Sequence, residues 1–161
     1  MAEINMEKAR EVYNSIVEAL EAREWTFDRN DEDLIIKTGI KGEDLPIEFL
    51  LIVNPRNEVI QFISRLPYNI PEEKRIDAAV AVCVANYGLV DGSFDYDVRD
   101  GEIRYRVTCS YIGSDVPADL VEYIIFIGVK TVDEYNDRLF MLSKGMISVQ
   151  EFLDQDRGNN N

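Results

Sequence analysis

The sequence predicts an α+β domain in which an antiparallel sheet packs against helices, in the order α-ββββ-α-ββ-α. Near the N-terminus, apolar residues recur at three- and four-residue spacing, which is typical of one face of a helix. Short apolar runs separated by turn residues follow, as expected for strands. Beyond a second helical segment, Asp100-Gly101 gives a strong hairpin signal, and a long helical pattern comes after it.

The first helix is predicted from Met6 to Glu24. Glutamates lie off its apolar stripe and should face water. The stripe consists of Ala9, Val12, Tyr13, Ile16, Val17 and Leu20.

Acidic and Pro-containing turns divide residues 25–66 into four strands of an antiparallel meander. If Asn54–Asn57 form the last turn, alternation gives the two final strands two apolar faces. A solvated face of an antiparallel sheet should be mostly polar, so we expect cover on both sides, from a helix or a second chain. One face holds Phe49, Leu51, Val53, Ile60 and Phe62, and the other holds Leu50, Ile52, Val59 and Ile63.

Three more helices are predicted. Pro71 opens the first, which is apolar nearly all round as far as Tyr87 and should therefore be central and buried. A long helix runs from about Pro117 to Lys144, with Gly128 as a candidate bend. Ser148-x-x-Glu151 matches a capping box for a short last helix. We expect a single domain over residues 1–154 and a frayed polar tail over residues 155–161.

The stretch FDYDVRDGEIRYR holds acids and bases close together. A two-residue turn at Asp100-Gly101 pairs Asp97 with Arg104 and Asp95 with Arg106, and it puts every charge on one face. Opposite charges across strands stabilise a register. A catalytic acid–base pair would need burial to shift its pKa, and this alternation favours exposure. We interpret the cluster as a ladder of ion pairs on a solvated face.

Charge and composition exclude several partners. Acids outnumber bases 31 to 17, the net charge is −14, and the basic residues are scattered. Binding to phosphates needs clustered Lys and Arg, so nucleic acid and anionic membrane are poor partners. The sequence has neither the apolar core of a signal peptide nor a run long enough to span a membrane. With two cysteines in apolar segments, Cys83 and Cys109, we expect a reduced, cytoplasmic protein.

The sequence also argues against an enzyme. Histidine is absent, which removes Ser–His and Cys–His nucleophiles and the commonest transition-metal ligand. An EF-hand interpretation of the segment beginning at Asp95 fails, because Arg99 and Arg106 occupy ligand positions. Phosphate-loop and nucleophile-elbow motifs are also missing. We therefore predict no catalytic residue, no metal and no cofactor.

Residues 65–113 carry a family resemblance. A strand leads into PEEKR, a buried helix reaches Asn86, and the hairpin follows, with Gly92, Phe94, Asp97, DGE at residues 100–102 and RYR at residues 104–106. With the long helix after VPADL, this pattern resembles the YbjN family of bacterial sensory-transduction regulators over roughly residues 58–143. The resemblance implies a fold similar to class I type III secretion chaperones, which are small, acidic, usually dimeric proteins that bind extended segments of other proteins. It implies no enzyme activity.

We therefore predict a non-enzymatic chaperone-like or regulatory protein that binds another protein or peptide segment, with basic segments as candidates, and that forms a homodimer. The alternative is a small-ligand sensor with a pocket between sheet and helices, lined by Trp25, Phe49, Phe62, Tyr87 or Tyr105. An enzyme using carboxylate chemistry ranks third. The candidate partner or dimer surface consists of Leu50, Ile52, Val59, Ile63, Ile124 and Ile127.

Overall fold

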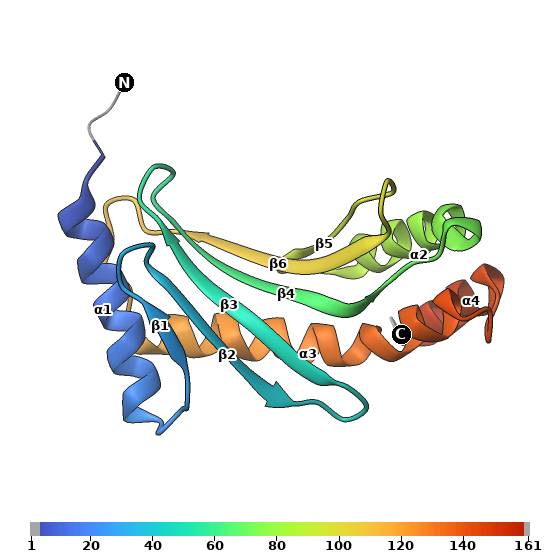
Figure 1. Ribbon diagram of the computed structural model, residues 1–161, viewed down its shortest axis with the longest axis horizontal. Helices are drawn as coiled ribbons and strands as arrows, with labels where there is room; N and C mark the ends of the chain where they lie inside the picture. The colour runs from blue at the N-terminus through green and yellow to red at the C-terminus, as the bar shows by residue number, and fades with distance from the viewer. Residues whose placement is uncertain (1–3, 160–161) are drawn as a thin grey trace.

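One antiparallel sheet organises the chain. The structure is a computed structural model that describes residues 4–159, with side chains as far as Asp156 (Figure 1). Within this part of the chain the sheet has six strands in the order β1-β2-β3-β4-β6-β5. The strands are β1 (Asp28–Asn30), β2 (Ile35–Lys41), β3 (Pro46–Asn54), β4 (Val59–Asn69), β5 (Ser93–Tyr96) and β6 (Glu102–Ser110). The predicted order of helices and strands is confirmed.

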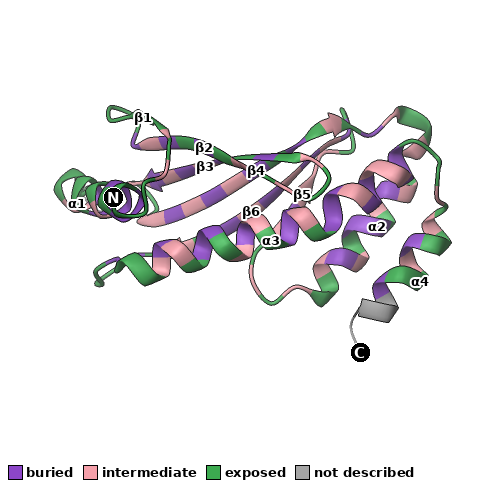
Figure 2. Ribbon diagram, turned by 90° about the horizontal axis from the view of Figure 1, so that it is seen from below, coloured by how far each residue is buried: buried purple, intermediate pink, exposed green. Residues whose placement is uncertain are grey.

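The helices lie against one face and one end of this sheet. Figure 2 shows α2, α3 and α4 on the same side of the sheet, with α1 beside the end that carries β1. Asn5 caps α1, since its side chain accepts a hydrogen bond from the Lys8 N–H at 3.0 Å. The helices are α1 (Met6–Ala22), α2 (Arg75–Gly88), preceded by a 3₁₀ turn at Glu72–Lys74, α3 (Ala118–Ser143) and α4 (Val149–Asn159).

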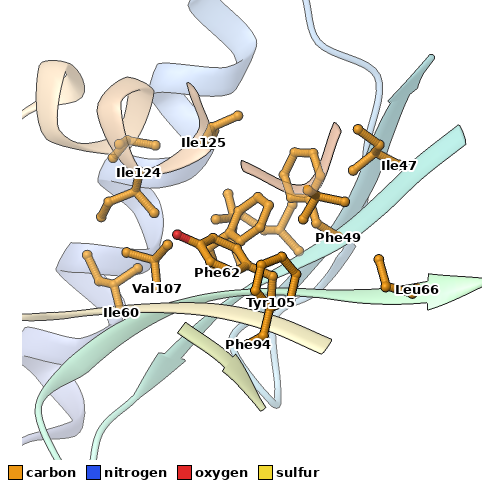
Figure 3. Close-up of a cluster of buried hydrophobic side chains, with 14 of the residues drawn as sticks. Ile47, Phe49, Ile60, Phe62, Leu66, Phe94, Tyr105, Val107, Ile124 and Ile125 are labelled. Atoms are coloured by element: carbon orange, nitrogen blue, oxygen red, sulfur yellow. The ribbon is translucent and has the colours of Figure 1, made fainter. Parts of the chain in front are cut away.

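The core lies between the sheet and α3. The predicted inner face of β3 and β4 is confirmed, because all five of its residues are buried. Figure 3 shows Phe49, Phe62, Tyr105 and Phe94 packed together, with Ile124 and Ile125 of α3 nearby. Phe49 and Phe62 stack with ring centroids 4.7 Å apart.

Gly128 is a point of close contact between α3 and the sheet. The helix is continuous from Ala118 to Ser143. A Cβ at Gly128 would lie 2.6 Å from the ring of Phe62, so the missing side chain lets α3 approach the sheet closely.

The prediction that α2 is buried all round is wrong. One side packs inward, with Ala78, Ala81, Val82 and Ala85 buried. The opposite side is open to solvent, and Cys83, expected in the core, is exposed there. The helix lies at the outer end of the fold, so within one chain only one of its apolar sides is covered (Figure 1).

The predicted hairpin register is also wrong, by two residues. Asp95 pairs with Arg104, and Tyr96 pairs with Ile103. The Asp97 N–H donates to the Glu102 carbonyl at 2.9 Å, which leaves a four-residue loop in place of a two-residue turn. A two-residue shift keeps every side chain on its predicted face. The acids therefore still meet bases, but with changed partners: Asp95 contacts Arg104 and Arg106, while Asp97 contacts Arg99.

The last helix extends into the expected tail. Ser148 and Glu151 form the predicted capping box, with hydrogen bonds of 2.7 and 3.2 Å. α4 then continues through residues 155–159, where fraying was expected, and residues 160–161 lie outside the described part. Asp156 is buried and accepts a hydrogen bond from the Tyr135 hydroxyl at 3.0 Å, which holds the helix in place.

Candidate functional site

An apolar groove runs between the end of α1, strand β2 and the first half of α3. Its cavity volume is about 740 Å³. The charged lining residues are Arg23, Asp119, Glu122 and Lys130, and the rest of the lining is mainly apolar. The remaining lining residues are Ala19, Leu20, Trp25, Ile40, Val121, Tyr123, Ile125, Phe126 and Val129.

Two aromatic side chains make this groove unusual for a surface. Phe126 is 64% exposed and Tyr123 is 47% exposed, although both belong to the apolar run YIIFIGV. Trp25 is half-buried in the groove and meets Phe49 of the core edge to face, with centroids 6.2 Å apart. Large exposed apolar side chains that line a hollow mark a binding surface more often than isolated ones do.

An ion pair and a hydrogen bond hold side chains in the wall of the groove. Arg23, just after α1, donates two hydrogen bonds of 2.9 and 2.8 Å to the carboxylate of Glu122 on α3. This bidentate ion pair ties the two helices that form the walls. The Tyr123 hydroxyl donates to Asp91 at 2.5 Å, and this hydrogen bond raises the pKa of Tyr123 above its usual value. The aromatic ring is thereby fixed at the mouth of the groove.

The two edges of the sheet differ in whether they can accept another strand. β1 pairs with residues 35–37 of β2 and no further. Past Lys37, the hydroxyl of the buried Thr38 donates to the Thr26 carbonyl at 2.8 Å, and beyond Thr38 no strand in the described chain lies beside β2 on that side. Ile40, in this unpaired part, lines the groove. At the opposite edge, the Asn86 side chain hydrogen-bonds both main-chain groups of Phe94 in β5. The β2 edge is therefore the more open one, and it lies beside the groove.

The predicted partner surface is only partly assembled. The register brings Leu50 opposite Ile63 and Ile52 opposite Ile35 on the sheet face away from α3. Leu50, Ile52, Val59 and Ile63 are half-buried there, and Figure 2 shows no helix over that face. The prediction that Ile124 lies on this surface was wrong. Ile124 is 3% exposed because it points into the core (Figure 3). Ile127 is half-buried against the same core.

The pocket predicted for a small-ligand sensor does not form with its predicted lining. Phe49, Phe62 and Tyr105 are buried in the core, and Tyr87 is 95% exposed on α2. Trp25 alone of the five lines the groove. Sequence alternation identified the inward-facing aromatics correctly, but it could not show that core side chains fill the space between them.

The described residues contain neither a metal-binding cluster nor a helix that could span a membrane. No cluster of three or more Cys, Asp or Glu side chains in residues 4–159 is placed to hold a metal ion. Within the same residues, no helix is both long and apolar enough to cross a membrane.

The acids and bases of the β5–β6 hairpin form partly exposed ion pairs. Asp95 contacts Arg104 and Arg106, and hydrogen bonds from Arg106 and Arg104 lower the pKa of Asp95 below its usual value. These charges stabilise the hairpin.

Sequence reasoning missed Tyr123, Phe126 and Ile40 as groove residues. The available signal was the run YIIFIGV, which is more apolar than one buried face of a helix requires. Its exposure depends on where α1 ends relative to α3, a tertiary relationship that local periodicity does not contain.

Comparisons with known proteins agree with this architecture. No curated protein matches the chain significantly. Among solved structures, the chain is similar to "YbjN, a putative transcription regulator from E. coli", with a TM-score of 0.60 and 9% identity, covering 78% of this chain and 92% of that one. It is also similar to a chain of the ExsC–ExsE complex, with a TM-score of 0.59 and 10% identity, covering 81% and 95%. A chain of the HopA1–SchA chaperone–effector complex gives a TM-score of 0.53 and 10% identity, covering 80% and 96%.

At these identities the structures show a common fold, the one expected from the resemblance to secretion chaperones. The family evidence is separate. Residues 13–141 match the YbjN family, described as "putative bacterial sensory transduction regulator". The match starts within α1 and includes the early strands, which the resemblance noted from sequence did not reach. The chain therefore belongs to the YbjN family.

Proposed function

We propose that the chain is a non-enzymatic protein that binds an extended segment of another polypeptide in the groove between α1, β2 and α3. The observation that carries this proposal is the juxtaposition of an open apolar groove with an unpaired strand end. A guest strand beside residues 39–41 of β2 would gain main-chain hydrogen bonds, and its alternate side chains would enter the groove. Trp25 and Phe126 are the aromatic anchors for those side chains.

The comparisons support this proposal at the level of the fold. One similar structure is of a chaperone–effector complex, and another is of the ExsC–ExsE complex, so this fold occurs in proteins that hold other proteins. A chaperone-like or regulatory role fits these relatives without requiring a catalytic group.

Charge sets the expected guest. With a net charge of −14, the protein should favour neutral or basic segments and attract them faster at low salt. Ordering a flexible guest opposes binding, so we expect modest affinity. We also propose a cytoplasmic location and a homodimeric state. The half-buried apolar residues of the open sheet face, Leu50, Ile52, Val59 and Ile63, are a secondary contact surface for the guest.

The single tryptophan offers a direct test. Trp25 is the one tryptophan of the chain and lines the groove, so its fluorescence should report binding. We would titrate an array of extended peptides, neutral, basic and acidic, at low and at physiological salt. Basic amphipathic peptides should change the Trp25 emission saturably and bind more tightly at low salt. Phe126→Asp should weaken binding at least tenfold, because it puts a charge among the apolar contacts.

Ile112→Asp is the matched control. Ile112 is 66% exposed, close to the 64% of Phe126, but it lies outside the groove. This variant should bind like the wild type. If no peptide binds, or if Phe126→Asp and Ile112→Asp bind equally well, the proposed site is wrong.

A small-ligand sensor is the second candidate, because a volume of about 740 Å³ also suits a small apolar molecule. A panel of apolar small molecules, read by the same tryptophan signal, separates the two functions. Saturable small-molecule binding, lost in Phe126→Asp, together with no peptide binding, would favour the sensor.

A further inference from the structure

The sheet face opposite α3 carries a band of apolar side chains along β3 and β4, the two central strands. The strand register places these residues together, on the side where Figure 2 shows no helix. Cover was expected on both faces of these strands, and the described chain provides it on one. The apolar band consists of the half-buried residues Ile35, Leu50, Ile52, Val59 and Ile63.

A guest on this band has to satisfy its own main-chain groups. β3 pairs with β2 and β4, and β4 pairs with β3 and β6. Strands with a neighbour on each side have no free edge to offer to another strand. A helix makes its backbone hydrogen bonds internally, and an amphipathic helix presents an apolar stripe. The apolar band therefore fits a helix, whereas the open β2 edge beside the groove fits a strand.

Arginines line the β6 side of the apolar band. Arg65 lies directly opposite Arg104 on β6, and Arg106 lies two residues further along the same strand. Like charges that face each other across strands oppose pairing. The carboxylates that these bases contact are Asp95, shared by Arg104 and Arg106, and Glu102, 3.4 Å from Arg65. Three bases against two acids leave one positive charge in excess, on a chain whose net charge is −14.

We infer that the open sheet face binds an amphipathic helix of a partner protein, with acidic residues along the flank that faces β6. The helix would follow β3 and β4, so that its apolar stripe covers the band and its acids meet the three arginines. From Val59 to Arg65 the strand extends about 20 Å, the length of roughly 14 residues of helix. This inference deepens the proposed function, which names the same face as a secondary contact, by stating what the guest presents there.

The acids elsewhere in the chain set the conditions of the measurement. A net charge of −14 repels an acidic helix at long range. At physiological ionic strength the Debye length is about 8 Å, so distant acids are largely screened while the contact pairs remain. The apolar stripe should therefore supply most of the affinity at physiological salt, and the charged flank should decide which helices bind.

Fluorescence anisotropy with labelled helical peptides tests the inference. The probe is a stapled peptide of about 14 residues with a leucine stripe and glutamates on one flank. One comparison peptide has lysines in place of the glutamates, and another has a scrambled order without a stripe. The glutamate peptide should bind saturably, the lysine peptide at least about fivefold more weakly, and the scrambled peptide not measurably. Absence of binding, or equal binding of the glutamate and lysine peptides, overturns the inference.

Arg65→Glu tests the charged flank. The Arg65 side chain is 66% exposed, and the new glutamate would lie opposite Arg104, so the fold should keep its stability. The variant should bind the glutamate peptide at least about fivefold more weakly and the lysine peptide more tightly. Arg10→Glu, at an exposed position of α1, changes the net charge equally and should bind like the wild type. Equal binding by these two variants contradicts the charged flank.

Ile52→Asp tests the apolar band. It puts a charge among the contacts of the helix and should abolish binding of the glutamate peptide. Ile112→Asp, at an exposed position off the band, is the matched control and should bind normally. If the wild type binds no helical peptide and its mass by light scattering falls in Ile52→Asp, a second copy of the chain covers the band and the inference is wrong.

The open face and the groove can fail separately. Trp25 lines the groove and meets Phe49 on the α3 side of the sheet, so the helical peptide should leave the Trp25 emission unchanged. Phe126→Asp should lose the extended peptides and keep the helical one, and Ile52→Asp should do the reverse. A helical peptide that changes the Trp25 emission and is lost in Phe126→Asp binds in the groove, which overturns the inference and leaves the proposed function standing.

Discussion

Asn86 of α2 acts on Phe94 as a neighbouring strand would. Its Nδ2 donates to the Phe94 carbonyl at 3.0 Å, and its Oδ1 accepts from the Phe94 N–H at 2.7 Å. Both main-chain groups point away from β6, the strand with which β5 pairs. One side chain therefore satisfies the edge strand at its centre and denies it to another chain.

Asn86→Ala should expose that edge. We expect a loss of about 1–3 kcal/mol in the free energy of unfolding, because two main-chain groups at a part-buried site lose their partner. Urea denaturation measures this loss, and light scattering over time should show increased aggregation. Asn86→Asp keeps the acceptor but cannot donate to the carbonyl, so its loss should be intermediate. Equal stability of the wild type, Asn86→Ala and Asn86→Asp would show that the hydrogen bonds from Asn86 to Phe94 do not stabilise the β5 edge.

Asp95→Asn should change how stability depends on pH. Hydrogen bonds from Arg106 and Arg104 hold the pKa of Asp95 below its usual value. A carboxylate with a depressed folded-state pKa stabilises the fold above its unfolded-state pKa, and that stabilisation is lost as the pH falls through the folded-state pKa. Near pH 7 the variant should be less stable than the wild type by about 1 kcal/mol.

The difference between these two proteins should begin to shrink as the pH falls below about 4, the ordinary pKa of Asp in the unfolded chain, and should be lost once the pH is below the depressed folded-state pKa of Asp95. Urea denaturation at several pH values provides the measurement. A difference that is constant from neutral to acid pH would mean that the Asp95 charge is irrelevant to stability. Asp137→Asn, at a half-buried acid of α3 away from the hairpin, is the matched control.

Gly128→Ala should destabilise the core. The new Cβ would lie 2.6 Å from the buried ring of Phe62, which has no space to move away. Overpacking of this kind costs roughly 1–3 kcal/mol. Combining it with Phe62→Leu should give a double variant more stable than the sum of the two single losses predicts, because the smaller side chain makes room. Simple additivity in denaturation experiments would argue against the close contact.

Divalent metals should leave stability unchanged. The acids of the described residues are dispersed or paired with bases, and no ligand cluster forms among them. Micromolar calcium or zinc should shift the melting temperature by less than a degree in thermal denaturation. A rise of several degrees, reversed by a chelator, would reveal a site that neither the sequence nor the geometry suggested.

Local patterns were enough to predict the order of the elements and the inner face of the sheet. Alternation in β3 and β4 placed Phe49 and Phe62 in the core, because a period of two fixes which side of a strand each residue faces. The capping box at Ser148 and Glu151 was equally reliable, since its hydrogen bonds involve neighbours in sequence.

Features that depend on tertiary packing could not be predicted from local sequence patterns. The predicted hairpin register was wrong by two residues. In the structure the Asp97 N–H donates to the Glu102 carbonyl, and the alternation of apolar and charged residues fits both registers equally well. α2 looked buried all round, since its composition cannot show that one side is at the end of the fold. The groove depends on α1 and α3 lying side by side, and Arg23 and Glu122 meet across 99 positions of sequence.

The groove is lined by the end of α1 and the first half of α3, and its Tyr123 reaches Asp91 in the segment after α2. In the proposed homodimer, each copy would carry one such groove. A guest with one suitable segment would gain nothing from the second groove. A guest with two segments could occupy both grooves if its linker were long enough to reach around the dimer. Binding of the first segment would hold the second segment at a high effective concentration near the second groove, so the guest would bind with avidity. Linker length would then select guests as strictly as sequence does.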